Sequence, residues 1–167
     1  MRVYIPATWA ILRELNANGI FSARSGWGFA VTPALLSSFE EGDEEEIAHF
    51  AFIDAARASL RLLGLGETEF PHRRVVISVD LPDSQVTLAD DQGDTVVKIQ
   101  PAQIAMSEVA ALHVDIESSE EATAKAIEAI HAADLGDEDA ELAVGDADDN
   151  FMAWYDPVEL PFLVELS

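Results

Sequence analysis

The sequence predicts an α/β or α+β domain, with helices packed on a mixed sheet of about five or six short strands. Three observations support this prediction. Amphipathic segments with recognisable helix caps occur together with short runs rich in β-branched residues. Two alternating runs flank a turn-like sequence at residues 90–93, which indicates a β-hairpin over residues 86–99. Of the 167 residues, 49% are hydrophobic, which suffices for one compact core.

The chain begins with a predicted strand and a predicted helix. Residues 2–5 form a β-rich run, which Pro6 is expected to end. Thr8 is a suitable N-cap for a helix over residues 9–18, because its side chain can accept a hydrogen bond from the first turn. Gly19 follows where a left-handed C-cap is favoured, so both ends of this helix are marked.

Two further helices are predicted in the first half of the chain. Residues 25–28 are turn-like, and residues 29–31 then form a short predicted strand. A Thr-Pro pair begins a short helix at residue 33 that ends near Gly42. Asp43 caps a longer helix ending before residue 64, with three Glu residues in its first turn. Its apolar residues are too numerous for a narrow stripe, so we expect a central, largely buried helix.

The second half of the chain alternates strands with one clear helix. Residues 73–80 are a continuous β-branched run, typical of a strand covered on both faces. The hairpin follows, and residues 101–107 remain ambiguous between a helical turn and irregular structure. Residues 110–115 are another predicted strand, and Ser119 opens a helix that extends to about residue 133.

An acidic segment at residues 134–150 separates this helix from the C-terminal elements. It carries eight carboxylates and few apolar anchors, so we predict a mobile loop with some helical character. Residues 151–155 then form an aromatic strand, and Pro157 begins a short C-terminal helix. The chain has no internal repeat and no linker rich in Pro, Gly or Ser, so we predict a single domain over residues 1–167.

Charge is the most unusual property of the sequence, with a formal net value of −23 at pH 7. Residues 1–74 carry ten acidic residues and seven arginines, whereas residues 75–167 carry 22 acidic residues and two lysines. A field of this sign repels nucleic acid and anionic membranes, so we predict binding to neither. Three interpretations remain open: the acidity serves solubility or reflects an acidic proteome, it attracts a basic protein partner, or it mimics the charge of DNA.

Composition and motifs exclude several classes of chemistry. The absence of Cys excludes disulfide scaffolds, thiolate nucleophiles and cysteine-ligated metals. No signal peptide or apolar run of membrane-spanning length occurs, which predicts a cytoplasmic protein. Neither a phosphate-binding glycine loop nor a Gly-x-Ser-x-Gly elbow is present, and the acidic segment fails the EF-hand template. We therefore predict no cofactor and no dedicated metal site.

Five stretches of the chain carry a resemblance to a known family: residues 1–8, 29–35, 55–63, 73–76 and 109–115. Together they resemble a family of uncharacterised actinobacterial cytoplasmic proteins, a domain of unknown function. The similarity spans nearly the whole chain and ends at residues 154–155. The resemblance implies a bacterial cytoplasmic setting, but it brings no activity and no catalytic residues to this sequence.

His113 and Asp115 are the weak candidates for catalysis. They stand two residues apart on a predicted strand, so their side chains point to the same face, as an acid–base pair requires. The competing interpretation is that His113 is an ordinary histidine of the interior or of a sheet edge.

Arg73 and Arg74 are the weak candidates for ligand binding. With Arg57 and Arg61, one turn apart on the central helix, they form the basic clusters of an acidic chain. These arginines either pair with internal carboxylates, which we favour, or form a pocket for a phosphate or carboxylate ligand.

An interaction surface is the third kind of candidate site. Its weak candidates are an aromatic residue in a Gly-flanked segment and four carboxylates of the acidic segment: Trp27, Asp137, Glu138, Asp139 and Glu141.

Two functional hypotheses follow from the sequence, and the function itself stays unknown. The first is a non-enzymatic protein-binding or regulatory module, monomeric or homodimeric, with a basic protein partner. The alternative is a small enzyme or anionic-ligand-binding protein with a pocket near Arg73, Arg74, His113 and Asp115. A concave pocket that joins these four residues favours the second hypothesis, and an apolar patch beside the acidic segment favours the first.

Overall fold

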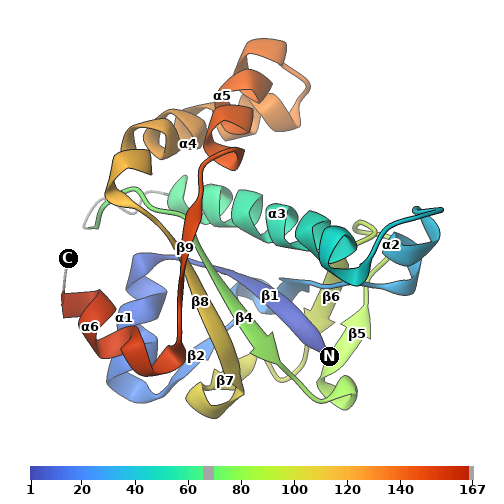
Figure 1. The fold of residues 1–167 in the computed structure, drawn as a ribbon, viewed down its shortest axis with the longest axis vertical. Coiled ribbons are helices and arrows are strands. Elements are labelled where there is room, and N and C mark those ends of the chain that lie inside the picture. The colour runs from blue at the N-terminus through green and yellow to red at the C-terminus, as the bar shows by residue number, and fades with distance from the viewer. Residues whose placement is uncertain (66–69, 166–167) are drawn as a thin grey trace.

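The computed structural model describes residues 1–65 and 70–165 of the chain, whose fold is shown in Figure 1. The described strands are β1 (Arg2–Ala7), β2 (Ile20–Ser22), β3 (Trp27–Phe29), β4 (Val75–Asp80), β5 (Val86–Leu88), β6 (Val96–Ile99), β7 (Gln103–Ala105), β8 (Val109–Asp115) and β9 (Met152–Tyr155). The described helices are α1 (Trp9–Asn18), α2 (Pro33–Ser37), α3 (Glu44–Leu63), α4 (Glu120–Asp134), α5 (Glu138–Asp148) and α6 (Leu160–Glu165).

Seven strands form the main sheet, in the order β5-β6-β3-β1-β4-β8-β9, and β2 pairs with β7 in a second, two-stranded sheet. The predicted α/β class and the hairpin of β5 and β6 are confirmed. Every pair of neighbouring strands is antiparallel, where we expected a mixed sheet of five or six strands. Apolar patterning locates strands but does not specify their direction, which depends on how the chain returns to the sheet.

One face of the main sheet holds the largest core. The helix α1 is capped by Thr8, which accepts a hydrogen bond from the Ile11 N–H, and it ends at Gly19 with φ of 70°. Buried α1 side chains pack with alternate residues of β1 and β4, and α6 lies against α1 on this side (Figure 1). The main members of this core are Val3, Ile5, Trp9, Leu12, Leu15, Ile77, Val79, Leu112, Leu160 and Leu163.

The opposite face is covered by α3, which lies over β1, β4 and β3. The Asp43 side chain accepts a hydrogen bond from the Glu46 N–H and so caps this helix, as predicted. Small residues, Ala55 and Ala56, allow α3 to approach the sheet closely. The outer side of α3 carries α4 and α5, which form a separate small cluster with Leu60 (Figure 1). No helix in the described residues is long and apolar enough to cross a membrane.

The structure differs from the sequence-based expectation in several N-terminal elements. The strand β1 continues through Pro6, which was expected to end it. The ladder between β1 and β3 contains Tyr4 but does not reach Pro6, so among the described strands Pro6 pairs with β4 alone, and its missing N–H is tolerated there. The strand β3 begins at Trp27, two residues earlier than predicted, and α2 ends at Ser37 rather than near Gly42. The pairing of β2 with β7 was not predicted.

The largest local difference is α5, which occupies most of the segment predicted to be a loop. Asp137 caps it by accepting a hydrogen bond from the Ala140 N–H. Ala140, Val144 and Ala147 are buried against α4, at the helical spacing that an apolar stripe requires. The small size of these residues concealed the stripe among the carboxylates. The predicted mobility of residues 134–150 and the single-domain organisation both stay predictions.

Candidate functional site

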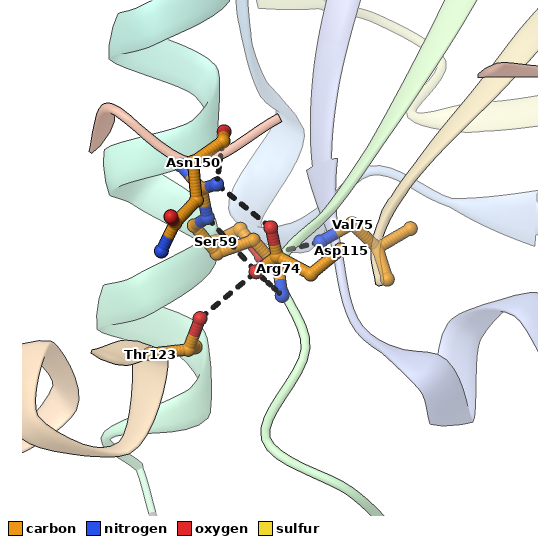
Figure 2. A network of polar contacts seen from close by, with 6 residues as sticks. All are labelled: Ser59, Arg74, Val75, Asp115, Thr123 and Asn150. Atoms are coloured by element: carbon orange, nitrogen blue, oxygen red, sulfur yellow. Dashed lines mark hydrogen bonds and ion pairs between the residues drawn. The ribbon is translucent and has the colours of Figure 1, made fainter. Parts of the chain in front are cut away.

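Two of the candidate residues, Arg74 and Asp115, form a buried ion pair (Figure 2). The Asp115 carboxylate accepts hydrogen bonds from Arg74 Nε at 2.9 Å and from Nη2 at 2.7 Å. It also accepts from the Arg74 backbone N–H and from the Thr123 hydroxyl. The side chains are 2% and 0% exposed, so a dense set of hydrogen bonds replaces their lost hydration.

This network connects elements that are far apart in the sequence. Arg74 directly precedes β4, Asp115 ends β8, and Thr123 belongs to α4. Arg74 Nη2 also donates to the Asn150 carbonyl, just after α5. Nearby, the Ser59 hydroxyl of α3 donates to the Ala7 carbonyl and accepts from the Val75 N–H. The arrangement therefore holds α3, α4 and the sheet together.

His113 lies on the same face of β8 as Asp115, as their spacing predicts, and faces α3. Its Nε2 is 2.8 Å from the Ser78 hydroxyl, and the Phe52 ring contacts it edge-on with centroids 4.8 Å apart. Burial lowers the pKa of His113 to about 4, with a smaller contribution from the positive charge of Arg2. His113 is therefore neutral at physiological pH.

Arg73 is directed away from its neighbour in the sequence. Its Nε donates to Glu120 at 3.0 Å, and its guanidinium lies 5.8 Å from the centre of the Trp9 ring. A hollow of about 490 Å³ beside β9 is lined by Arg74, but not by Arg73, His113 or Asp115. The geometry thus unites Arg74 with Asp115 and leaves Arg73 and His113 with partners of their own.

The predicted acidic surface is organised around α4 and α5. Residues 120–150 carry 11 acidic residues and a single lysine. Asp137 caps α5, while Glu138, Asp139 and Glu141 follow in its first turn, where the helix dipole stabilises negative charge. These three glutamate and aspartate side chains lie on exposed positions. The four candidate carboxylates therefore share one end of one helix.

Two aromatic side chains are exposed directly after this helix. Phe151 is 69% exposed, and Trp154 on β9 is 58% exposed. Among the described residues β9 pairs only with β8, so its other edge is open. The hollow near Arg74 lies between this strand and α3, lined in part by Phe52, Asp148 and Phe151. Large apolar side chains and a strongly acidic helix pair thus meet at one edge of the sheet.

Trp27 occupies a different place, on β3, where it faces a groove beside α3. Lys98 of the neighbouring strand β6 lies over its ring, with Nζ 4.3 Å from the ring centre. Trp27 was a candidate from the sequence, whereas Lys98 and Arg24, which accompany it, were not predicted. The alternation of Trp27 with Phe29 was the available signal, because residues two apart on a strand share a face.

The described residues contain no group of three or more His, Asp or Glu side chains arranged to hold a metal ion.

The fold and these surfaces define a strongly acidic α/β protein, built on a seven-stranded antiparallel sheet with an internal arginine–aspartate network. The model of the Family of unknown function (DUF6912) matches residues 1–164, and the chain belongs to this family. The comparisons with curated proteins and with solved structures found no match. The expected membership of a domain family of unknown function is therefore confirmed.

Proposed function

We propose that the protein is a non-enzymatic protein-binding module, and that α5 and the adjoining edge of β9 bind a basic protein partner. The observation that carries this proposal is the position of the exposed Phe151 and Trp154 beside the acid-rich helix pair. Exposed aromatic residues supply binding energy in protein interfaces, while surrounding charges steer the encounter.

Internal ion pairs neutralise only part of the negative charge of this surface. Six of the nine Lys and Arg residues pair with carboxylates inside the described structure. Four of these pairs use carboxylates of α4 or α5, and the other seven acidic residues of the range 120–150 form no ion pair among the described residues. A basic partner would be attracted by this excess of negative charge on approach, which raises association rates.

One buried oxygen supports the same partner chemistry. Asp148, at the end of α5, accepts a hydrogen bond from Arg57 Nε through its Oδ2 atom. Its Oδ1 atom is buried and has no hydrogen-bond partner among the described residues. Asp148 also lines the hollow beside Phe151. A Lys or Arg side chain of the partner, entering this hollow, would supply the missing donor.

The setting of the proposed module follows from the family resemblance and the charge. We place it in the cytoplasm of an actinobacterium, without nucleic acid or membrane as a ligand. A net charge of −23 opposes contact with phosphate backbones. Oligonucleotide titrations at physiological salt test this part of the proposal: micromolar affinity that weakens steeply with salt contradicts it.

The alternative of an enzyme or anion-binding protein near Arg73, Arg74, His113 and Asp115 receives less support from the geometry. The carboxylate of Asp115 already neutralises Arg74, and Glu120 pairs with Arg73. An anion would have to displace these partners in order to bind.

The test uses a synthetic peptide of alternating Lys and Val residues, because such a strand matches both the open edge and the carboxylates. The variant D137N/E138Q/D139N/E141Q is expected to keep its fold and its N-cap, since Asn also caps helices. Its association with the peptide should be slower than that of the wild type and should depend less on salt, because peripheral charges act mainly on the encounter rate. Stopped-flow fluorescence at low and physiological salt measures both effects.

A matched control loses the same number of charges elsewhere. The variant E40Q/E41Q/D90N/D91N changes exposed positions near α2 and in the β5–β6 hairpin. It should associate at nearly the wild-type rate. W154A should instead accelerate dissociation, because the exposed ring contributes contact area. Equal rates for the two charge variants would overturn the proposal that α5 is the docking surface.

A further inference from the structure

A groove of about 540 Å³ lies between the C-terminal half of α3 and the strands β3 and β6. It exists because the side chains of β3 alternate between the two faces of the sheet. Trp27 and Phe29 point into the groove, whereas Gly28 points into the core, where a Cβ atom would lie 2.7 Å from Val3 Cγ1. The helix α3 covers β1, β4 and β3 but leaves the β6 side open.

The charge of the groove is opposite to that of the molecule. Within residues 1–65 and 70–165 no acidic residue lines this groove, whereas Arg24 and Arg61 do. Lys98 stands at its margin, and its Nζ donates to the Ser25 carbonyl at 2.7 Å. Within residues 1–65 and 70–165, neither Arg24 nor Lys98 forms an ion pair with a carboxylate. Their charges are therefore available to an outside anion.

Arg61 has a fixed position at the groove wall. Its Nε and Nη2 atoms both donate to Asp134 at 2.9 Å, which holds the guanidinium in one orientation. A guanidinium oriented in this way loses less conformational entropy when it contacts a ligand. The groove thus combines the Arg61 guanidinium, which is held by Asp134, with two cations that form no ion pair within the described residues.

The remaining lining is largely apolar and includes Phe29, Leu62 and Val96. A small inorganic anion would leave these surfaces in contact with water. A ligand with an apolar body would cover them and gain hydrophobic stabilisation. The lining therefore fits a molecule that has both an anionic group and an apolar part.

We propose that this groove binds a small organic anion, namely a phosphate or carboxylate carried on an aromatic or aliphatic body. The anionic group contacts Arg24 and Lys98, and the body lies on Phe29 and Val96. Repulsion by the distant carboxylates is weak at physiological salt, because the Debye length is about 8 Å. The short-range contacts then determine affinity. This site is separate from the surface on α5 and β9, so each proposal can fail without the other.

Phenyl phosphate is the first probe, and phenylacetate represents ligands with a carboxylate group. Inorganic phosphate and phenol serve as half-ligands, because each carries only the anionic group or only the aromatic body. Isothermal titration should show that phenyl phosphate or phenylacetate binds at least about tenfold more tightly than either half-ligand, because one charge-assisted contact suffices for this difference. Shifts of the Trp27 indole and Gln92 amide signals in NMR should locate the bound molecule. Stronger binding of one probe identifies the anionic group that the site prefers.

Variants separate this site from general charge effects. R24A/K98A should weaken binding by about tenfold or more while leaving the fold intact, because neither side chain is buried. K125A is the control for a cation lost elsewhere, since it removes one positive charge from the exposed face of α4. Circular dichroism verifies that each variant is folded. The proposal is overturned if neither organic anion binds more tightly than its half-ligands, if R24A/K98A binds like K125A, or if the NMR shifts cluster around the hollow near Arg74.

Discussion

Two ion pairs of the same type occur in very different surroundings in this molecule. Arg74 with Asp115 and Arg61 with Asp134 are both bidentate, and each uses Nε and Nη2 of the guanidinium. The first pair is almost fully buried, while the second is 45% and 42% exposed. Water solvates the second pair whether or not it forms, but cannot reach the first. Burial, rather than hydrogen-bond geometry, should therefore determine what each pair contributes to stability.

The largest effect is expected when the buried pair is broken. D115N leaves the Arg74 guanidinium buried without a counter-charge, so the free energy of unfolding should fall by about 3–5 kcal/mol. T123V removes one hydrogen bond to the same carboxylate and should cost about 1 kcal/mol. Urea denaturation measures both values. If D115N lowered the free energy of unfolding by less than T123V does, water would have to reach Arg74. The contrast with the Arg61 pair would then disappear.

The second effect is a pH dependence of stability that arises from His113, which is neutral and lies on the same face of β8 as Asp115. Burial lowers its pKa from 6.5 to about 4, so between these values the unfolded chain binds a proton that the folded protein does not. The contribution to stability is complete above pH 6.5 and is lost as the pH falls toward 4, by about 3 kcal/mol in total.

Denaturation of H113Q across this range tests the effect. The variant should show a flatter dependence of stability on pH than the wild type, because Gln does not titrate. H131Q provides the control for the loss of a histidine, since His131 is exposed on α4. Parallel curves for the wild type and H113Q would mean that folding leaves the pKa of His113 unchanged.

A smaller effect is expected when the exposed pair is broken. The hydrogen bonds from Arg61 hold the pKa of Asp134 below its ordinary value, so the pair is charged at neutral pH. Even so, D134N should change the free energy of unfolding by less than about 1 kcal/mol, because water replaces the lost contacts. The same urea experiment measures this value. A loss near that of D115N would contradict the role assigned to burial.

The last expected difference concerns local motion and does not involve the global free energy of unfolding. We expect backbone amides in residues 134–150 to exchange with solvent faster than those of α3, because small residues anchor α5 while its carboxylates repel one another. Hydrogen exchange followed by NMR tests this expectation. Slow exchange throughout the segment would instead indicate a rigid helix pair.

Local signals in the sequence were sufficient to predict the main helices. Thr8 and Gly19 mark both ends of α1, and Asp43 marks the start of α3, because each acts on backbone groups within one turn. The helix α5 was missed as a regular element, although Asp137 caps it, since its buried stripe consists of small residues. The pairing of β2 with β7 depends on contacts distant in sequence, which local patterns do not specify.

The candidate site shows the same limit. The spacing of His113 and Asp115 placed both side chains on one face of β8. The pairing of Asp115 with Arg74 follows instead from the register of β4 with β8. This register brings together two residues that are 41 positions apart in the sequence. The groove beside Trp27 requires β6 and the end of the β2–β3 connection to meet α3. No single stretch of sequence contains that information.

The open edges of the main sheet have a consequence for how the protein behaves at high concentration. In the described residues, β5 at one end and β9 at the other have unpaired outer edges, and β9 displays Trp154. Such edges can template strand pairing between copies, which leads to aggregation. A charge of −23 on every copy opposes that approach. Acidification or concentrated salt weakens this repulsion. Both conditions should therefore promote aggregation of the protein at high concentration.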